Sequence, residues 1–547
     1  MTAVTAVEPV VSLKYAGYRG VPLENGITQW LGMRYAAAPL GPLRFAPPQD
    51  PPPFDDQILA IEAADKHGPI CLATGDNPAN TATSEDCLFL DVYAPTNAAT
   101  GSRLPVYVFI QGGGFNSLSN ANYNGSGLIA AAEHEIVVVT FNYRVGPYGF
   151  IASREISDSP SATVNNGLRD QRKALEWVQS YISLFGGDPD HVVLGGDSAG
   201  AASIALHLTA FGGRDDGLFV GAAAESVSFA TVLTVEESQY QYDNFVERVG
   251  CANSITGNSD VNTLSCLRSK TSQELQAQNK NIPYPGSQGA PLFMWNPVLD
   301  DDLIQYYTYD AFAHGDFIKV PVIFGDDTNG GTVFTPRGTQ SQAQSSRFLH
   351  DQFPYLTTDH LERINTLFPN QGPNFPDSGP FWRQVSNAYG DLRYMCPNLF
   401  ISTAFARHGN PKQNWNYRFN VRDPALTQQG LGVPHTVEIA AIWGPENVHG
   451  GCPNSFRPGA ENAWVVPFIQ GYWTSFIRTL DPNLHRQPGT PEWKPFTSVG
   501  GVAAESQDTA LNRLLFDTSS TSGMETVDAA KRGACQYFSS IGAQIRQ

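Results

Sequence analysis

Short runs of β-branched and other apolar residues recur along the chain, separated by stretches of helical or loop character. Such runs predict buried strands. Strands that alternate with helices indicate a mostly parallel sheet, whose ligands bind beyond the carboxyl ends of the strands. We therefore expect functional residues directly after these strands. The six runs are residues 106–111, 136–141, 191–195, 219–224, 320–324 and 415–419.

Two segments carry apolar residues at helical spacing. Residues 168–182 predict a crossover helix between the second and third strands, with Asn165 and Asn166 available as caps at its start. Residues 463–477 predict a second helix whose apolar face packs in the core. The chain shows no internal repeat and no long linker, so we expect a single domain over residues 1–547.

Composition narrows the possible functions. The chain has 547 residues, of which 41% are hydrophobic and 16% charged, so it can bury a large core and is not disordered. Its net charge of −18 disfavours nucleic acid and anionic membranes as partners. No apolar run approaches the roughly 18 residues that span a bilayer, so stable membrane insertion is not expected. Residues 1–9 show no export signal.

Seven cysteines bear on the compartment. They form no C-x-x-C pair and have no histidines nearby at zinc spacing, so we expect no metal site. Cys71 with Cys87, and Cys251 with Cys266, are close enough in sequence to form short disulfide loops, which imply an oxidising compartment. The alternative is buried free thiols in a cytosolic enzyme. In either case one cysteine must stay unpaired.

A candidate nucleophile follows the third strand. That strand runs into Gly196-Asp197-Ser198-Ala199-Gly200, and residues 201–208 predict a helix. A G-x-S-x-G motif between strand and helix holds its serine on a strained turn above the sheet, where small neighbours let backbones approach closely. Ser198 is therefore the expected nucleophile. A tight turn without chemistry is the alternative.

Two long segments around this motif resemble the type-B carboxylesterases, a family that includes cholinesterases and large fungal lipases and esterases. Residues 185–200 fit the family's nucleophile signature, and residues 85–95 fit its second signature. Shorter matches extend to Cys535. The resemblance implies an α/β-hydrolase fold, with a large mostly parallel central sheet flanked by helices. It also implies ester hydrolysis through a serine acyl-enzyme, without a cofactor.

Three glycines follow the first predicted strand, in the segment Gln-Gly-Gly-Gly-Phe at residues 111–115. Glycines there let backbone N–H groups point at a bound oxygen without side-chain obstruction. By resemblance, Gly113, Gly114 and Ala199 form the oxyanion hole. A flexible glycine-rich loop is the alternative.

The general base is expected late in the chain, because this fold orders its triad as serine, acid, histidine. His435 lies in Gly432-Val433-Pro434-His435-Thr436-Val437-Glu438, which resembles the histidine loop of the family. His449, in a glycine-rich loop, is the alternative.

The triad acid departs from the family pattern. The family places a glutamate just before Gly-Thr, and Gly330 stands at that position here. A charge appears instead at Glu225, where the family usually has glutamine, so we assign Glu225 as the displaced acid. Asp326 and Asp327 are competitors nearer the usual loop. Glu438 is a weaker candidate for the acid. Family members that keep the usual triad glutamate also carry a glutamate at this position, which indicates a structural role.

Together these residues predict a carboxylic ester hydrolase acting on a small-molecule ester. The alternatives are a lipase with long-chain specificity, a cholinesterase-like enzyme and a non-catalytic recognition protein on the same fold. Only 15 residues, none of them tryptophan, separate Cys71 from Cys87. The family builds its lid or gorge wall from this loop, so we expect short- to medium-chain or soluble esters and poor use of quaternary ammonium esters.

The resemblance also pairs Cys396 with Cys535 and leaves Cys452 free. We expect a secreted protein from these pairs. The sequence leaves open the oligomeric state and the glycosylation of the N-x-S sequon at Asn124.

Overall fold

The computed structural model describes most of the chain. Residues 1–8 lie outside the described residues, so the prediction that residues 1–9 carry no export signal falls almost wholly outside them. The described ranges are residues 9–53, 61–77, 79–252, 263–370, 374–496, 511–518 and 521–547.

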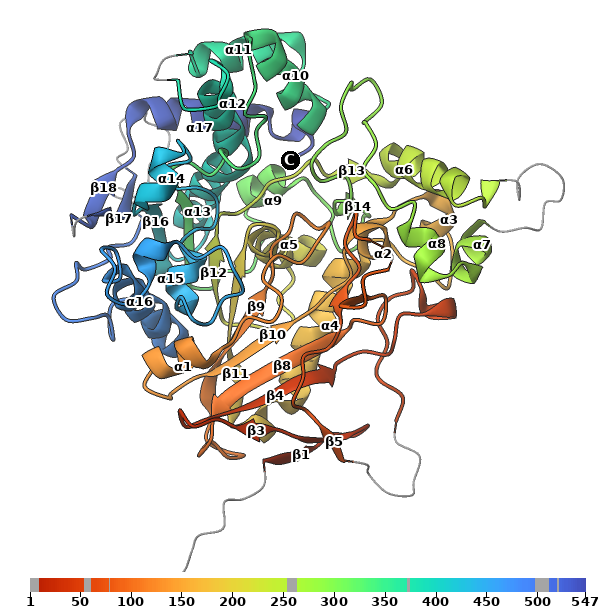
Figure 1. The fold of residues 1–547 in the computed structure, drawn as a ribbon, viewed down its shortest axis with the longest axis vertical. Coiled ribbons are helices and arrows are strands. Elements are labelled where there is room, and N and C mark those ends of the chain that lie inside the picture. The colour runs from red at the N-terminus through yellow and green to blue at the C-terminus, as the bar shows by residue number, and fades with distance from the viewer. Residues whose placement is uncertain are drawn as a thin grey trace, which may run out of the picture.

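An 11-stranded sheet forms the centre of the molecule (Figure 1). Seven neighbouring strands of it are parallel, as predicted, and its two edges are antiparallel. The parallel strands are, in spatial order, β10 (Val137–Phe141), β9 (Leu104–Ile110), β11 (Gly187–Asp197), β12 (Gly221–Glu225), β15 (Val322–Asp327), β16 (Asn414–Asn420) and β17 (Asn512–Asp517). The antiparallel strands are β8 (Phe89–Pro95), β4 (Ile27–Arg34) and β3 (Val21–Pro22) beside β10, and β18 (Gly523–Thr526) beside β17.

All six predicted strands are confirmed. Because side chains alternate along each strand, the sheet has two buried faces. Val108 and Leu194 pack into one hydrophobic cluster, whereas their neighbours Tyr107 and Val193 pack into another on the opposite face. Helices α4 (Asn166–Tyr181) and α5 (Ala199–Gly213) supply residues to the first cluster, and α1 (Ser126–Ala131), α15 (Ile439–Trp443) and α16 (Val465–Thr479) to the second (Figure 1).

The two predicted helices are present as α4 and α16, but the predicted caps are wrong. Asn165 has a left-handed backbone with φ 58° and makes no side-chain cap. Its Nδ2 instead donates 2.9 Å hydrogen bonds to the Val298 carbonyl and to Oδ2 of Asp300. Asn166 donates to the Phe45 carbonyl. Both amides are used to join α4 to distant loops, which local sequence does not reveal.

Smaller elements surround this centre. The remaining strands form β1 (Val10–Ser12), β2 (Gly17–Arg19) and β5 (Ile61–Ala63) in one sheet, with β6 (Ile70–Cys71) and β7 (Thr83–Ser84), and β13 (Leu233–Thr234) and β14 (Val298–Leu299), as two pairs. The other α-helices are α2 (Gly146–Phe150), α3 (Arg154–Ser157), α6 (Val235–Arg248), α7 (Thr263–Ser269), α8 (Ser272–Gln276), α9 (Thr308–His314), α10 (Gln342–Gln352), α11 (Thr358–Leu367), α12 (Trp382–Gly390), α13 (Cys396–His408), α14 (Pro424–Gln428) and α17 (Ala529–Ile541).

Disulfides join Cys71 to Cys87, Cys251 to Cys266, and Cys396 to Cys535, the pairs that the sequence analysis named. The third pair ties α13 to α17, 139 residues apart in sequence. Cys452 is a free, half-buried thiol.

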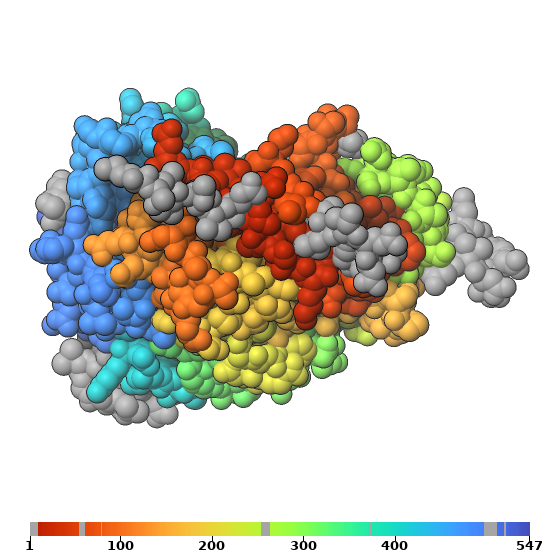
Figure 2. Space-filling model, turned by 90° about the horizontal axis from the view of Figure 1, so that it is seen from below, coloured from red at the N-terminus to blue at the C-terminus, as the bar shows by residue number. Residues whose placement is uncertain are grey.

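Seen from below, segments from the C-terminal part of the chain form one side of the molecule and residues 230–252 and 263–290 the opposite side, with segments from the first half of the chain between them (Figure 2). Within the described ranges, no helix is long and apolar enough to cross a membrane.

Candidate active site

Ser198 occupies a sharp turn between β11 and α5. Its backbone has φ 55° and ψ −116°, a combination that a residue with a side chain rarely adopts. Its amide donates a 2.9 Å hydrogen bond to the Glu225 carbonyl at the end of β12, which fixes the turn to the neighbouring strand. The serine thus lies at the carboxyl end of the sheet, at the start of a helix.

The glycines around Ser198 are required by close backbone contacts. A Cβ on Gly200 would lie 1.9 Å from the Ile110 carbonyl oxygen, and one on Gly196 would lie 2.8 Å from the Gly200 carbonyl carbon. Asp197 joins this turn to the next loop, because its Oδ1 accepts a 2.9 Å hydrogen bond from the Gly112 amide. Burial raises the pKa of Asp197 to about 7.

The glycine loop after β9 has backbone angles and close contacts that require glycine. Gly113 and Gly114 have φ values of 117° and 62°, and a Cβ on Gly113 would lie 2.1 Å from the Ser117 carbonyl oxygen. Asn116 braces the loop through a 2.7 Å hydrogen bond from its Nδ2 to the Gly114 carbonyl. Among the described residues, the Gly113 and Gly114 amides donate no hydrogen bond, so both can bind a substrate oxygen.

His435 lies in the loop between α14 and α15, with its ring against two aromatic side chains. The Tyr394 ring is 4.1 Å from it, and the Phe334 ring 5.2 Å, centroid to centroid. Both ring nitrogens are buried and have no hydrogen-bond partner among the described residues. Burial, and then the Arg393 guanidinium, lower the pKa of His435 to about 3, so the ring is neutral.

Two of the candidate acids are engaged away from His435. Glu225 accepts a 2.8 Å hydrogen bond from the Trp473 indole at Oε1 and a 3.2 Å bond from the Gly196 amide at Oε2. Asp326 accepts a 2.7 Å hydrogen bond from Asn398 and lies 3.5 Å from Arg513. No hydrogen bond joins either carboxyl to His435 in the described part of the chain.

Asp327 is the candidate acid that contacts the histidine loop. Its Oδ2 accepts a 2.6 Å hydrogen bond from the Thr436 amide and a 3.2 Å bond from the Ser226 hydroxyl. Burial, and then the nearby carboxyl of Glu438, raise the pKa of Asp327 well above its usual range. Burial also raises the pKa of Glu438, whose Oε1 accepts a 2.7 Å bond from the Tyr417 hydroxyl. Asp327 thus lies beside a second buried carboxyl, that of Glu438.

The sequence analysis missed the side chains that enclose this site. Phe293 lies over the glycine loop, where a Cβ on Gly114 would come within 2.2 Å of its ring. Phe334 contacts Phe293 at 6.1 Å and Tyr394 at 5.6 Å between ring centroids. Arg393 lies beside them. These residues come from distant segments, and their only sequence signal is that Arg393 and Tyr394 precede the matched cysteine at 396.

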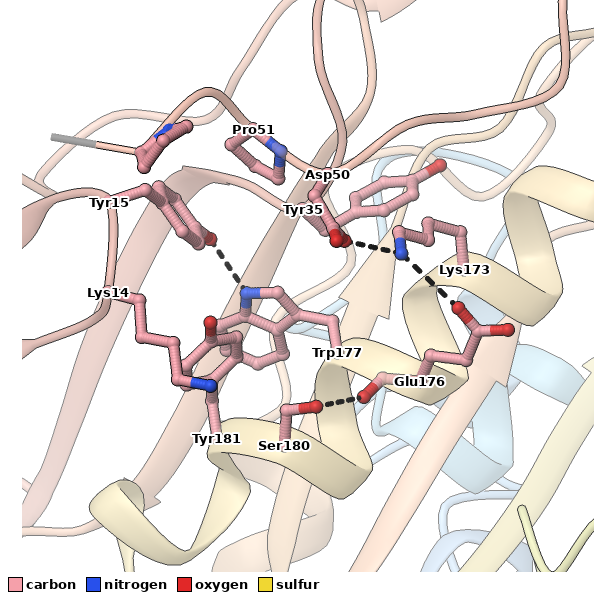
Figure 3. Close-up of a pocket in the computed structure, with 11 residues that line it drawn as sticks. Lys14, Tyr15, Tyr35, Asp50, Pro51, Lys173, Glu176, Trp177, Ser180 and Tyr181 are labelled. Atoms are coloured by element: carbon pink, nitrogen blue, oxygen red, sulfur yellow. Dashed lines mark hydrogen bonds and ion pairs between the residues drawn. The ribbon is translucent and has the colours of Figure 1, made fainter.

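A separate surface pocket of about 470 Å³ lies beside α4 and contains none of these residues (Figure 3). Three of its charged side chains are paired with one another, because Lys173 lies 2.5 Å from Asp50 and 3.3 Å from Glu176. Its aromatic wall is fixed by a 2.8 Å hydrogen bond from the Trp177 indole to the Tyr15 hydroxyl. This pocket is distinct from the turn that carries Ser198.

A parallel sheet that carries a serine on a strained strand-to-helix turn, next to a glycine loop, defines an α/β hydrolase. Residues 7–516 match the model of the Carboxylesterase family, and the chain belongs to this family. It is accordingly a carboxylic ester hydrolase. The predicted fold is thereby confirmed.

Individual relatives agree with this assignment. The structure of EstA from Aspergillus niger superposes with a TM-score of 0.91 at 40% identity, over 99% of each chain. Secreted lipase 4 of Gibberella zeae is 29% identical over 87% of this chain and 83% of its own length. Fumonisin B1 esterase of Sphingopyxis macrogoltabida is 30% identical over 88% of this chain and 83% of its own length.

Proposed function

We propose that the chain, folded as one domain, hydrolyses esters through an acyl-enzyme on Ser198, with His435 as the general base. The strained backbone of Ser198 at the end of β11 is the observation that carries this assignment. Ser198 Oγ attacks the ester carbonyl carbon while His435 takes its proton. The protonated histidine then gives that proton to the departing alcohol. Water, activated in the same way, releases the acid and restores the serine.

The amides of Gly113, Gly114 and Ala199 stabilise the negative oxygen of the tetrahedral intermediate. Loss of one such donor typically costs about 10²- to 10³-fold in kcat. The unbonded amides of Gly113 and Gly114 support this role. The free nitrogens of His435 fit it as well, because catalytic hydrogen bonds commonly tighten only when substrate binds.

For the acid, the contacts support Asp327 over Glu225. A triad carboxylate must hold the histidine in one tautomer and stabilise the imidazolium. Asp327 accepts a hydrogen bond from the residue next to His435, whereas both oxygens of Glu225 are bound by Trp473 and Gly196. Glu225 stays the alternative.

We propose short- to medium-chain, soluble esters as substrates. The Cys71–Cys87 loop is short, and aromatic rings of Phe293, Phe334 and Tyr394 enclose the site. Activity should fall along a 4-nitrophenyl ester series from butyrate to palmitate, and butyrylcholine should be a poor substrate. Sharp activation at a lipid interface by long-chain triglycerides would favour the lipase alternative.

We also propose that the protein is secreted. Its three disulfides require an oxidising compartment, and one of its relatives carries the description of a secreted lipase. To test this, the esterase is measured separately in the culture medium and in the cell extract of an expressing fungus, and most of it should be found in the medium.

The central test is pre-steady-state hydrolysis of 4-nitrophenyl butyrate. Wild type should release a burst of about one equivalent of nitrophenol and carry a butyryl group on Ser198, found by peptide mass. Ser198→Ala should lose both. Ser180→Ala, at an exposed serine on α4, is the matched control and should keep both. Turnover that persists in Ser198→Ala, or a wild type without a burst or turnover, would favour the non-catalytic alternative.

A further inference from the structure

Arg393 differs from the other buried arginines in having no carboxylate partner. In the described part of the chain, four arginines are buried, with exposed fractions of 2–5%. Three of them pair with acids: Arg44 with Glu85, Arg144 with Asp170, and Arg513 with Asp326 and Glu525. A buried charge without a counter-ion is costly, so such arginines are normally paired or bind a ligand.

The surroundings of Arg393 hold its position without neutralising its charge. Its Nε donates a 2.9 Å hydrogen bond to the Ser228 hydroxyl, and its carbonyl accepts a 2.9 Å bond from the Phe229 amide. Its Cζ lies 5.2 Å from the Phe293 ring centroid and 5.9 Å from that of Tyr394. Aromatic faces offset only part of the cost of a buried cation. The side chains of Tyr389 and Tyr394 also interact with the guanidinium, but neither is a carboxylate, and burial raises the pKa of both hydroxyls, which keeps them neutral.

The same two rings connect Arg393 to the reacting groups. Phe293 touches the oxyanion glycine Gly114, and Tyr394 stacks on His435. Arg393 itself lies on a π-helical turn, Asp391–Met395, between α12 and α13. Such turns are rare and frequently occur at functional sites. One aromatic ring therefore separates the unpaired guanidinium from the glycine loop, and another separates it from His435.

We propose that Arg393 binds a carboxylate carried by the substrate, so that the preferred esters are half esters of dicarboxylic acids or esters of hydroxy acids. This inference rests on the proposed function of Ser198 and His435. A guanidinium whose Nε edge is already held presents its two Nη groups as a fork that fits a carboxylate. At a buried guanidinium such as that of Arg393, this pairing is stronger than at the surface.

The test compares esters that differ only in a terminal carboxylate. Two pairs carry it on the acyl side: 4-nitrophenyl hexanoate with the adipate half ester, and 4-nitrophenyl octanoate with the suberate half ester. A third pair, phenyl butyrate with 3-(butyryloxy)benzoate, carries it on the alcohol side. The measured quantity is the ratio of kcat/KM for the anionic ester to that for the neutral ester.

Arg393→Gln should lower this ratio at least tenfold for one or more pairs, and Arg393→Lys should retain part of it. Arg363→Gln, an exposed arginine on α11, removes the same charge and should leave every ratio within twofold. Ratios unchanged in Arg393→Gln, with neutral esters still hydrolysed through Ser198, would overturn the inference alone. Wild type inactive on every neutral and every anionic ester would instead overturn the proposed function.

A second measurement needs no variant. Adipate should inhibit wild-type hydrolysis of 4-nitrophenyl butyrate competitively, with a Ki at least tenfold below that of the neutral diamide adipamide. Equal Ki values for the two compounds would contradict a carboxylate site at Arg393.

Discussion

The Thr436 amide donates a 2.6 Å hydrogen bond to Oδ2 of Asp327. This contact joins the end of β15 to the loop that carries His435, two segments more than 100 residues apart in sequence. The family's glutamate would stand at Gly330, three residues after Asp327. The carboxylate that the family places on the loop after this strand is thus replaced, in our proposal, by one on the strand's last residue.

Asp327→Asn should lower kcat by about 10³- to 10⁴-fold, because the histidine loses the charge that stabilises its imidazolium. Glu225→Gln should stay within tenfold of wild type, because in the described part of the chain the Glu225 carboxyl makes no hydrogen bond to His435 or its loop, and a glutamine of similar shape can keep the bond from Trp473. Steady-state hydrolysis of 4-nitrophenyl butyrate measures both, with Asp326→Asn as a control for charge loss on the same strand. The opposite order, with Glu225→Gln the more severe variant, would restore Glu225 as the acid.

Restoring the family's glutamate should rescue the enzyme that lacks Asp327. Gly330 does not need a left-handed backbone, and a Cβ there would lie 3.7 Å from the Tyr394 ring, an ordinary contact. The double variant Asp327→Asn/Gly330→Glu should therefore recover at least tenfold in kcat over Asp327→Asn.

The matched control for this rescue is Asp327→Asn/Gly330→Ala, which adds a side chain without a charge and should recover nothing. Equal recovery by alanine and glutamate would show that the effect comes from the backbone and not from a carboxylate.

Local pattern was sufficient for six of the seven parallel strands and for the residues on them. The run at residues 191–195 and the glycines after it specify both β11 and the turn at Ser198, because strand burial and a tight turn are local requirements. Strand β8 was not predicted, although residues 85–95 were matched to the family. Its polar residue Asp91 interrupts the apolar run, and the partner of Asp91 is the Gly32 amide on another strand, which local sequence does not reveal.

The side-chain network of the site could not be predicted in the same way. The bond between Thr436 and Asp327, the closeness of the Asp327 and Glu438 carboxyls, and the packing of Tyr394 on His435 all join distant segments. Each depends on how the strand ends and loops meet in space. The only sequence signal for this network was Gly330, which stands where the family has its triad glutamate. The absence of that glutamate implies that another carboxyl lies within reach of the histidine.

The pH dependence of kcat/KM should show that the general base His435 stays unprotonated in acidic solution. Burial and the Arg393 guanidinium lower the pKa of His435 from 6.5 to about 3. Since a general base acts in its neutral form, a lower pKa extends activity to lower pH, and the acid limb of His435 should lie below pH 6.5. Rates between pH 3.5 and 8, with product measured by chromatography, test this.

Tyr394→Ala should move that limb upward, because water then reaches the ring and stabilises its charged form. Tyr394→Phe keeps the ring and should leave the limb in place. A wild-type limb at pH 6.5 that neither variant moves would contradict the burial of His435 as the cause.

The disulfide between α13 and α17 should stabilise the fold more than the one beside β6. A cross-link restricts the unfolded chain more when it closes a longer loop, by about 5 kcal/mol for the 139-residue separation of Cys396 and Cys535, against about 3 kcal/mol for the 16-residue separation of Cys71 and Cys87. Alanine at both cysteines of each pair should lower the urea midpoint in that order. A Cys452→Ala background prevents exchange with the free thiol and should itself leave the midpoint unchanged, because Cys452 is half-buried and unpaired. If loss of the Cys71–Cys87 pair proved the more damaging, native-state contacts around that loop would outweigh the entropy of the unfolded chain.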